Sequence, residues 1–161
     1  MLKRLQTLLV TLSLCVGTVW AGPEDDAAAA ADRKDFATVL KIIRPQAIKG
    51  EAWAQTRLAD AYFKGQAVLS DYAEAVRWYK LAAAQGYANA QIKLGTMYGK
   101  GQGVLEDYAR AHMWFNLAAA AGNLNAVEGR DIIVRLMTPQ QIAEAQKLAR
   151  ECQARNFKNC D

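Results

Sequence analysis

Apolar residues recur at helical spacing through most of the chain after residue 21. In the stretch 52–64, Ala54, Leu58, Ala61 and Tyr62 fall on one face of a helix. A turn that contains glycine follows, and a second apolar stripe runs through residues 72–83. The pattern predicts amphipathic helices arranged in pairs and joined by short turns, which is an all-α fold.

The pair of helices is repeated. Residues 52–87 align with residues 88–123 without a gap, and twenty of the 36 positions are identical. The first copy is AWAQTRLADAYFKGQAVLSDYAEAVRWYKLAAAQGY, and the second is ANAQIKLGTMYGKGQGVLEDYARAHMWFNLAAAAGN. A repeat of this length is typical of helical solenoids, in which each unit packs only on its neighbours.

The same register extends in both directions, so we divide the mature chain into four units and a tail. Residues 24–50 form a diverged unit, residues 124–137 form a partial unit, and the whole solenoid spans 22–137. The partial unit departs from the pattern at Arg130, where the full copies have leucine. Thr138 and Gln141 predict a capping box around Pro139, so residues 138–161 are expected to form a capping helix and a tail.

The quoted copies resemble the Sel-one-like repeat, a subclass of the tetratricopeptide-like helical repeats. The shared signature is A-x-A-Q-x-x-L-A/G-x-x-Y-x-x-G-x-x-V, followed by D-Y-x-x-A-x-x-W-Y/F-x-x-A-A-x-x-G. The resemblance implies a right-handed α/α superhelical solenoid of antiparallel helix pairs. It also implies a role in protein–protein interaction, often in the bacterial envelope or outside the cell.

The first 21 residues have the features of a signal peptide. Lys3 and Arg4 precede an uncharged, mostly apolar run, and Val19-Trp20-Ala21 resembles a signal peptidase site. An uncleaved membrane anchor is the alternative, but the run is short for a bilayer span. We therefore expect cleavage after Ala21, a periplasmic or secreted protein, and no membrane span in the mature chain.

Two cysteines remain after cleavage, Cys152 and Cys160. An even pair in an exported chain predicts a disulfide. Two thiols and one histidine do not make a usual zinc site, so no metal is expected. Removing Lys3 and Arg4 lowers the net charge from +4 to +2. Such a weak charge does not indicate nucleic-acid binding.

No catalytic or cofactor motif emerges from the sequence. The glycine-rich segment 99–103 recurs as Lys64-Gly65-Gln66 in the first copy, which marks it as a turn and not a phosphate loop. His112, which replaces Val76 of the first copy, is expected to be a structural helix residue. Ser70 lies a repeat away from it, so a nucleophile–base pair is not predicted. An envelope hydrolase of the β-lactamase or peptidoglycan type is the alternative function, supported only by family analogy.

The resemblance implies that the first helix of each pair lines a concave groove for a protein or peptide partner. In the repeat register, the variable positions between core residues are the groove candidates. These are Trp53, Thr56, Asp60, Phe63, Asn89, Ile92, Thr96, Lys100 and Asn125, with Glu128 as a further candidate. Aromatic residues are enriched among binding hot spots, which favours Trp53 and Phe63. The alternative that Trp53 packs against the preceding helix stays open.

Overall fold

The computed structural model describes residues 21–160, so the expected signal peptide lies outside the described residues except for Ala21. The described part forms α1 (Pro23–Asp32), α2 (Phe36–Lys49), α3 (Ala52–Lys64), α4 (Tyr72–Ala83), α5 (Ala88–Lys100), α6 (Tyr108–Ala120), α7 (Leu124–Val134) and α8 (Pro139–Ala154). These are eight α-helices, and residues 21–160 contain no β-strand. The predicted all-α solenoid is confirmed. The right-handed superhelical twist stays a prediction.

An aspartate begins the second helix of each full copy. The side chains of Asp71 and Asp107 accept hydrogen bonds from the backbone N–H groups of Glu74 and Arg110, at 3.0 and 2.9 Å. These bonds satisfy donors at the start of α4 and α6 that have no partner within the helix. The predicted capping box of α8 is also present, because Thr138 and Gln141 bond reciprocally.

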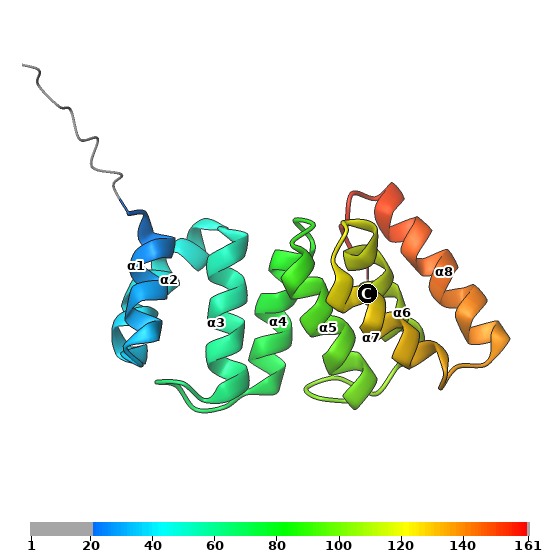
Figure 1. Cartoon of the computed structure of the whole chain (residues 1–161), viewed down its shortest axis with the longest axis horizontal. Coiled ribbons are helices and arrows are strands. Elements are labelled where there is room, and N and C mark those ends of the chain that lie inside the picture. Colours follow the sequence, from blue (N-terminus) through cyan, green and yellow to red (C-terminus); the bar gives the residue numbers. More distant parts are fainter. Residues whose placement is uncertain (1–20, 161) are drawn as a thin grey trace, which may run out of the picture.

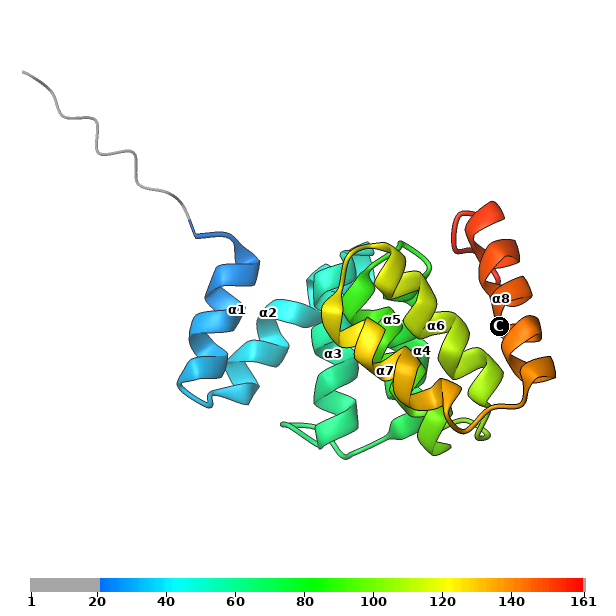
Figure 2. The ribbon, with the colours of Figure 1, turned by 45° about the vertical axis from the view of Figure 1, so that its right-hand side comes forward.

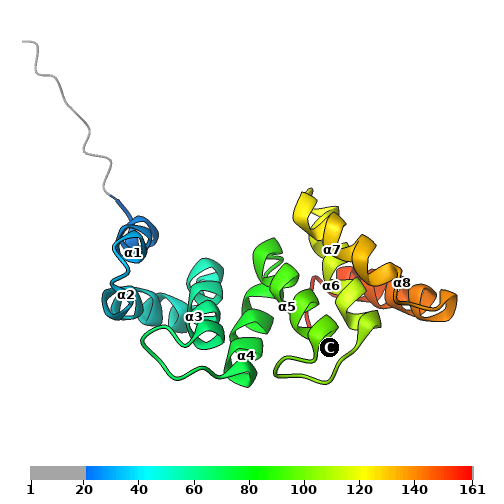
Figure 3. The same cartoon turned by 60° about the horizontal axis from the view of Figure 1, so that its bottom comes forward.

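The helix pairs stand in a row, and α8 closes the C-terminal end (Figure 1). The first helices, α1, α3, α5 and α7, lie along one side of the row, and α2, α4 and α6 lie along the other (Figure 3). Each helix packs on the next one along the chain up to α7, whereas α8 packs back onto α6. The solenoid thus has one surface made of first helices and an opposite surface made of second helices.

Two clusters of buried side chains form the core. The smaller cluster joins α1, α2 and α3 around Ile43 and Leu58, and the larger one runs from α3 to the C-terminal tail around Tyr79 and Trp114. Buried glutamines join consecutive units. Gln55 donates through Nε2 to the carbonyl oxygen of Ala47 at 3.3 Å, and its counterpart Gln91 donates to Ala83 at 3.4 Å. Each glutamine therefore adds a second hydrogen bond to a carbonyl group near the end of the preceding helix, which already accepts one from the backbone N–H of Gly50 or Gly86.

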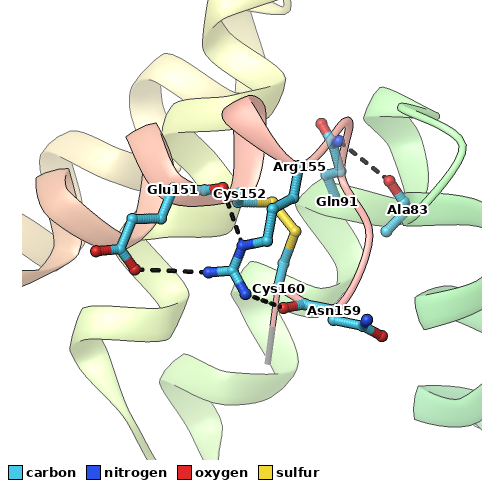
Figure 4. The surroundings of a disulfide bond; sticks show 7 residues. All are labelled: Ala83, Gln91, Glu151, Cys152, Arg155, Asn159 and Cys160. Atoms are coloured by element: carbon cyan, nitrogen blue, oxygen red, sulfur yellow. Dashed lines mark hydrogen bonds and ion pairs between the residues drawn. A yellow bond between two sulfur atoms is a disulfide. The ribbon is translucent and has the colours of Figure 1, made fainter.

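The predicted disulfide between Cys152 and Cys160 is present, and Cys152 is fully buried (Figure 4). Arg155 holds the loop between the two cysteines. It donates through Nε to the carbonyl oxygen of Glu151 at 3.2 Å and through Nη1 to that of Asn159 at 3.1 Å. The ring of Phe157 lies beside Gly86, so the tail is docked against the turn between α4 and α5. Among the described residues, no helix is long and apolar enough to cross a membrane.

Candidate binding groove

A polar hollow lies on the surface made by the first helices. It has a volume of about 310 Å³. Its lining residues are Glu24, Trp53, Thr56, Arg57, Asp60, Tyr87, Asn89, Ile92, Lys93 and Asn125. Residues from α1, α3, α5 and α7 border this one hollow, and these four helices lie along the same side of the row (Figure 3). We call this surface the groove.

The carboxylate of Asp60 is held in place within the polar hollow by a hydrogen bond. The hydroxyl of the buried Tyr79 donates to its Oδ1 at 2.5 Å, and Lys93 Nζ lies 4.0 Å from the same oxygen. Burial raises the pKa of Tyr79 far above its usual value, and the Asp60 carboxylate adds to the effect. Tyr79 therefore stays protonated and holds the carboxylate in one orientation at the groove floor.

An apolar hollow adjoins the polar one towards the C-terminus and shares Ile92 and Asn125 with it. It has a volume of about 390 Å³. Its lining residues are Ile92, Gly95, Thr96, Gly99, Lys100, Phe115, Asn125, Glu128, Gly129, Ile132, Ile133 and Leu136. Ile132 and Leu136 are 53% and 58% exposed, so they present apolar surface to solvent.

Glycines shape the apolar hollow. A Cβ atom built on Gly95 would lie 3.0 Å from the ring of Phe115, and one built on Gly129 would lie 2.6 Å from it. The ring of Phe115 therefore fits between α5 and α7 because both helices carry glycine there. A Cβ on Gly99 would lie 3.0 Å from Cδ1 of Ile133. The third glycine thus lets a side chain of α7 approach α5.

The two hollows arise from substitutions at equivalent positions of the two copies. Asp60 and Tyr79 of the first copy, which bond to each other, become Thr96 and Phe115 in the second. The carboxylate and the phenol hydroxyl are both lost, so the second hollow is apolar where the first is polar.

Eight of the nine predicted groove residues line one or both hollows. Trp53, Thr56, Asp60 and Asn89 line the polar hollow, Thr96 and Lys100 line the apolar one, and Ile92 and Asn125 line both. The further candidate Glu128 lines the apolar hollow. Whether these residues bind a partner stays a prediction.

The two aromatic residues predicted to line the groove, Phe63 and Trp53, differ in the direction of their side chains. Phe63 lines neither hollow. Its ring lies 5.2 Å from that of Tyr72 and packs against the larger core cluster, because the last turn of α3 faces the start of α4. Trp53 is half-buried and does two things at once: it packs against the cluster formed with α2, and it lines the polar hollow.

The sequence prediction missed two groups of groove residues. Arg57 and Lys93 occupy equivalent positions and follow Thr56 and Ile92 directly, so a wider helical stripe would have included them. Ile132 and Leu136 are equivalent to Thr96 and Lys100 one unit later. Extending the register to the end of the partial unit would have found both.

The other candidate residues do not form a catalytic constellation in the described part of the chain. The Ser70 hydroxyl donates to the carbonyl oxygen of Phe63 at 3.3 Å, on the turn before α4. His112 is buried on α6, and no hydrogen bond joins it to Ser70. Within residues 21–160, no group of three or more histidine, cysteine or acidic side chains is placed to hold a metal ion.

Comparisons with known proteins agree with this architecture. The family model of the Sel1 repeat matches residues 54–87 and 88–123. The chain is similar to a protective antigen of uropathogenic Escherichia coli strains that displays an SLR fold, with 30% identity and a TM-score of 0.80 over 86% of this chain and 30% of that one. It is also similar to a Sel1 repeat protein from Oxalobacter formigenes, with 27% identity and a TM-score of 0.62 over 65% of this chain and 43% of that one. The chain thus spans less than half the length of either protein. A search of curated proteins found no match.

Proposed function

The chain belongs to the Sel1-like repeat proteins, and from this premise we propose that it is a protein–protein interaction scaffold that binds a peptide or protein segment in its groove. Proteins with this repeat typically serve as such scaffolds. The observation that carries the proposal is that equivalent positions of α3, α5 and α7 converge on two adjoining hollows.

The chemistry of the hollows indicates what kind of segment would fit. Arg57, Asp60 and Lys93 offer charges of both signs in the polar hollow, and the amides of Asn89 and Asn125 can bond to a peptide backbone. The apolar hollow offers Ile132 and Leu136 to an apolar side chain. An extended segment with polar residues at one end and a large apolar residue at the other would satisfy both.

The proposed location is the periplasm or the extracellular medium. The disulfide between Cys152 and Cys160 supports it, because such bonds persist in oxidising compartments. The sequence features of residues 1–21 point the same way.

A pull-down from an envelope extract tests the proposal with two matched leucine variants. Leu136→Glu places a charge in the apolar hollow, whereas Leu81→Glu places it on the exposed side of α4. We expect Leu136→Glu to lose a partner that the wild type and Leu81→Glu both retain. Identical partner profiles for all three proteins would contradict binding in the groove.

A further inference from the structure

A third hollow, with basic and amide side chains, lies away from the groove. Helices α7 and α8 both pack on α6 and make few contacts with each other, and α6 lies between them in Figure 2. Residues of all three helices line the hollow. Its lining residues are His112, Asn116, Arg130, Val134, Ile142, Gln146, Ala149, Arg150 and Gln153. We call it the basic trough. Its volume is about 450 Å³, and none of its lining residues is acidic.

Two residues that line the trough differ in chemical character from the equivalent residues one unit earlier. In the first copy and the helix after it, Val76 and Leu94 are both buried in the larger core cluster. One unit later the equivalent positions are His112 and Arg130. Burying a histidine without hydrogen-bond partners is costly, and the half-buried Arg130 adds a positive charge on the neighbouring helix. A ligand in the trough would supply partners to both nitrogen-bearing side chains.

His112 lacks a hydrogen-bond partner at one ring nitrogen. The side chain is 4% exposed, and its Nδ1 has no partner within the described part of the chain. Burial lowers the pKa of His112, and the positive charge of Arg130 lowers it further, whereas Asp131 on α7 acts in the opposite direction. An anion in the trough would offset the charge of Arg130 and favour the protonated imidazole.

Two arginines can reach such an anion from opposite walls. Arg130 on α7 uses Nε and Nη2 to contact a single oxygen of Asp131, at 3.2 and 3.1 Å, which leaves other N–H groups of its guanidinium available. Arg150 on α8 is exposed and makes no ion pair with another described residue. The amides of Asn116, Gln146 and Gln153 add uncharged donors.

We propose that the basic trough binds a phosphate group, either as inorganic phosphate or as a phosphate monoester. Donors converge from α6, α7 and α8, and a tetrahedral anion can accept hydrogen bonds from three sides. A carboxylate offers only two oxygens in one plane and suits this arrangement less well. The site is separate from the groove, so it does not depend on the function proposed above.

The sole histidine of the chain makes the test direct. In protein labelled with ¹³C-histidine, the ring resonances of His112 are followed by NMR during titration with phosphate, glycerol 3-phosphate, acetate or sodium chloride at matched ionic strength. We expect a saturable shift with phosphate, with the monoester or with both, and an upward change in the pKa of His112. No saturable shift with either phosphate ligand, or an equal shift with acetate or chloride, would overturn the proposal.

Two exposed arginines provide matched variants, and neither side chain is part of the core. Arg150→Gln removes a cation that lines the trough, and Arg135→Gln removes one that does not. Because charge-assisted hydrogen bonds contribute strongly, we expect Arg150→Gln to weaken phosphate binding about 10-fold or more. Arg135→Gln should bind as the wild type does. Equal weakening in the two variants would indicate general electrostatic attraction and contradict a specific site.

Discussion

One of the differences between the helix-joining loops of the two copies, alanine at residue 67 against glycine at residue 103, predicts opposite effects of two substitutions. Ala67 has a φ of 57°, in the left-handed region, and its counterpart Gly103 has a φ of 71°. An alanine in this conformation is strained by about 1–2 kcal/mol, whereas glycine is not. Glycine also makes the unfolded chain more flexible, which offsets about 0.5–1 kcal/mol of that gain. Ala67→Gly should therefore stabilise the protein by about 0.5–1 kcal/mol.

Gly103→Ala should do the reverse. Besides its positive φ, a Cβ atom at residue 103 would lie 2.4 Å from the carbonyl oxygen of Tyr72, at the start of α4. Backbone atoms cannot move aside cheaply, so the loop must shift away from the neighbouring unit. We expect a loss of about 2 kcal/mol or more, since strain and overpacking both contribute.

Thermal and urea unfolding, followed by circular dichroism at 222 nm, measure both effects. For a domain of this size, each kcal/mol changes the Tm by about 2–5 °C. A lower Tm for Ala67→Gly, or an unchanged Tm for Gly103→Ala, would refute the reasoning. The conservative substitution Gln66→Asn, in the same turn, serves as a control and should change the Tm little.

Three further predictions concern the core and the tail. Reducing the Cys152–Cys160 disulfide should destabilise the protein by about 2.5 kcal/mol on the chain-entropy estimate, and an unchanged Tm would mean that the tail contributes nothing to the fold. Phe115→Ala should cost about 3–5 kcal/mol in urea unfolding, because it empties the space between two helices, and a loss below 1 kcal/mol would show that the glycines around it do not matter. Because the pKa of His112 is lowered in the folded state, the unfolded state binds more protons, so stability should fall as the pH drops below about 6.5 and level off below the folded pKa. His112→Val, which restores the residue of the first copy, should remove this part of the pH dependence in chloride buffers, and the same slope in both proteins would contradict the assignment.

Much of the fold was predictable because the same helix and turn signals occur in both copies of the repeat. The aspartate caps, the glycine turns and the capping box at Thr138 are local signals, and α4, α6 and α8 begin where such a signal predicts. The disulfide was predictable because only two cysteines remain outside the segment expected to be cleaved.

The positions that face the groove were predictable from the repeat register, but the polar or apolar character of its hollows was not. The spacing of positions on α3 and α5 brings Asp60 and Thr96 to the groove. The direction of the Phe63 ring depends on its packing with Tyr72, which no periodicity encodes. The apolar hollow depends on Phe115 fitting between glycines of two helices that are distant in sequence. Such properties come from tertiary packing, so a sequence pattern cannot supply them.

The basic trough also depends on tertiary packing that the sequence pattern does not supply. Arg130 and His112 each break the repeat pattern in the sequence, but separately they indicate only a diverged end unit. Their meeting with Arg150 depends on α8 folding back onto α6, outside the repeat register.

We propose that the partner binds in the groove and not on the opposite surface. Site-specific photo-crosslinking tests this most directly, with a benzophenone amino acid placed at Ile132 in the apolar hollow or at Leu81 on α4. We expect a discrete crosslinked protein from Ile132 that is absent from Leu81 and is lost when Asn89→Ala and Lys93→Ala are added. Crosslinks that are equal at both positions, or confined to Leu81, would contradict it.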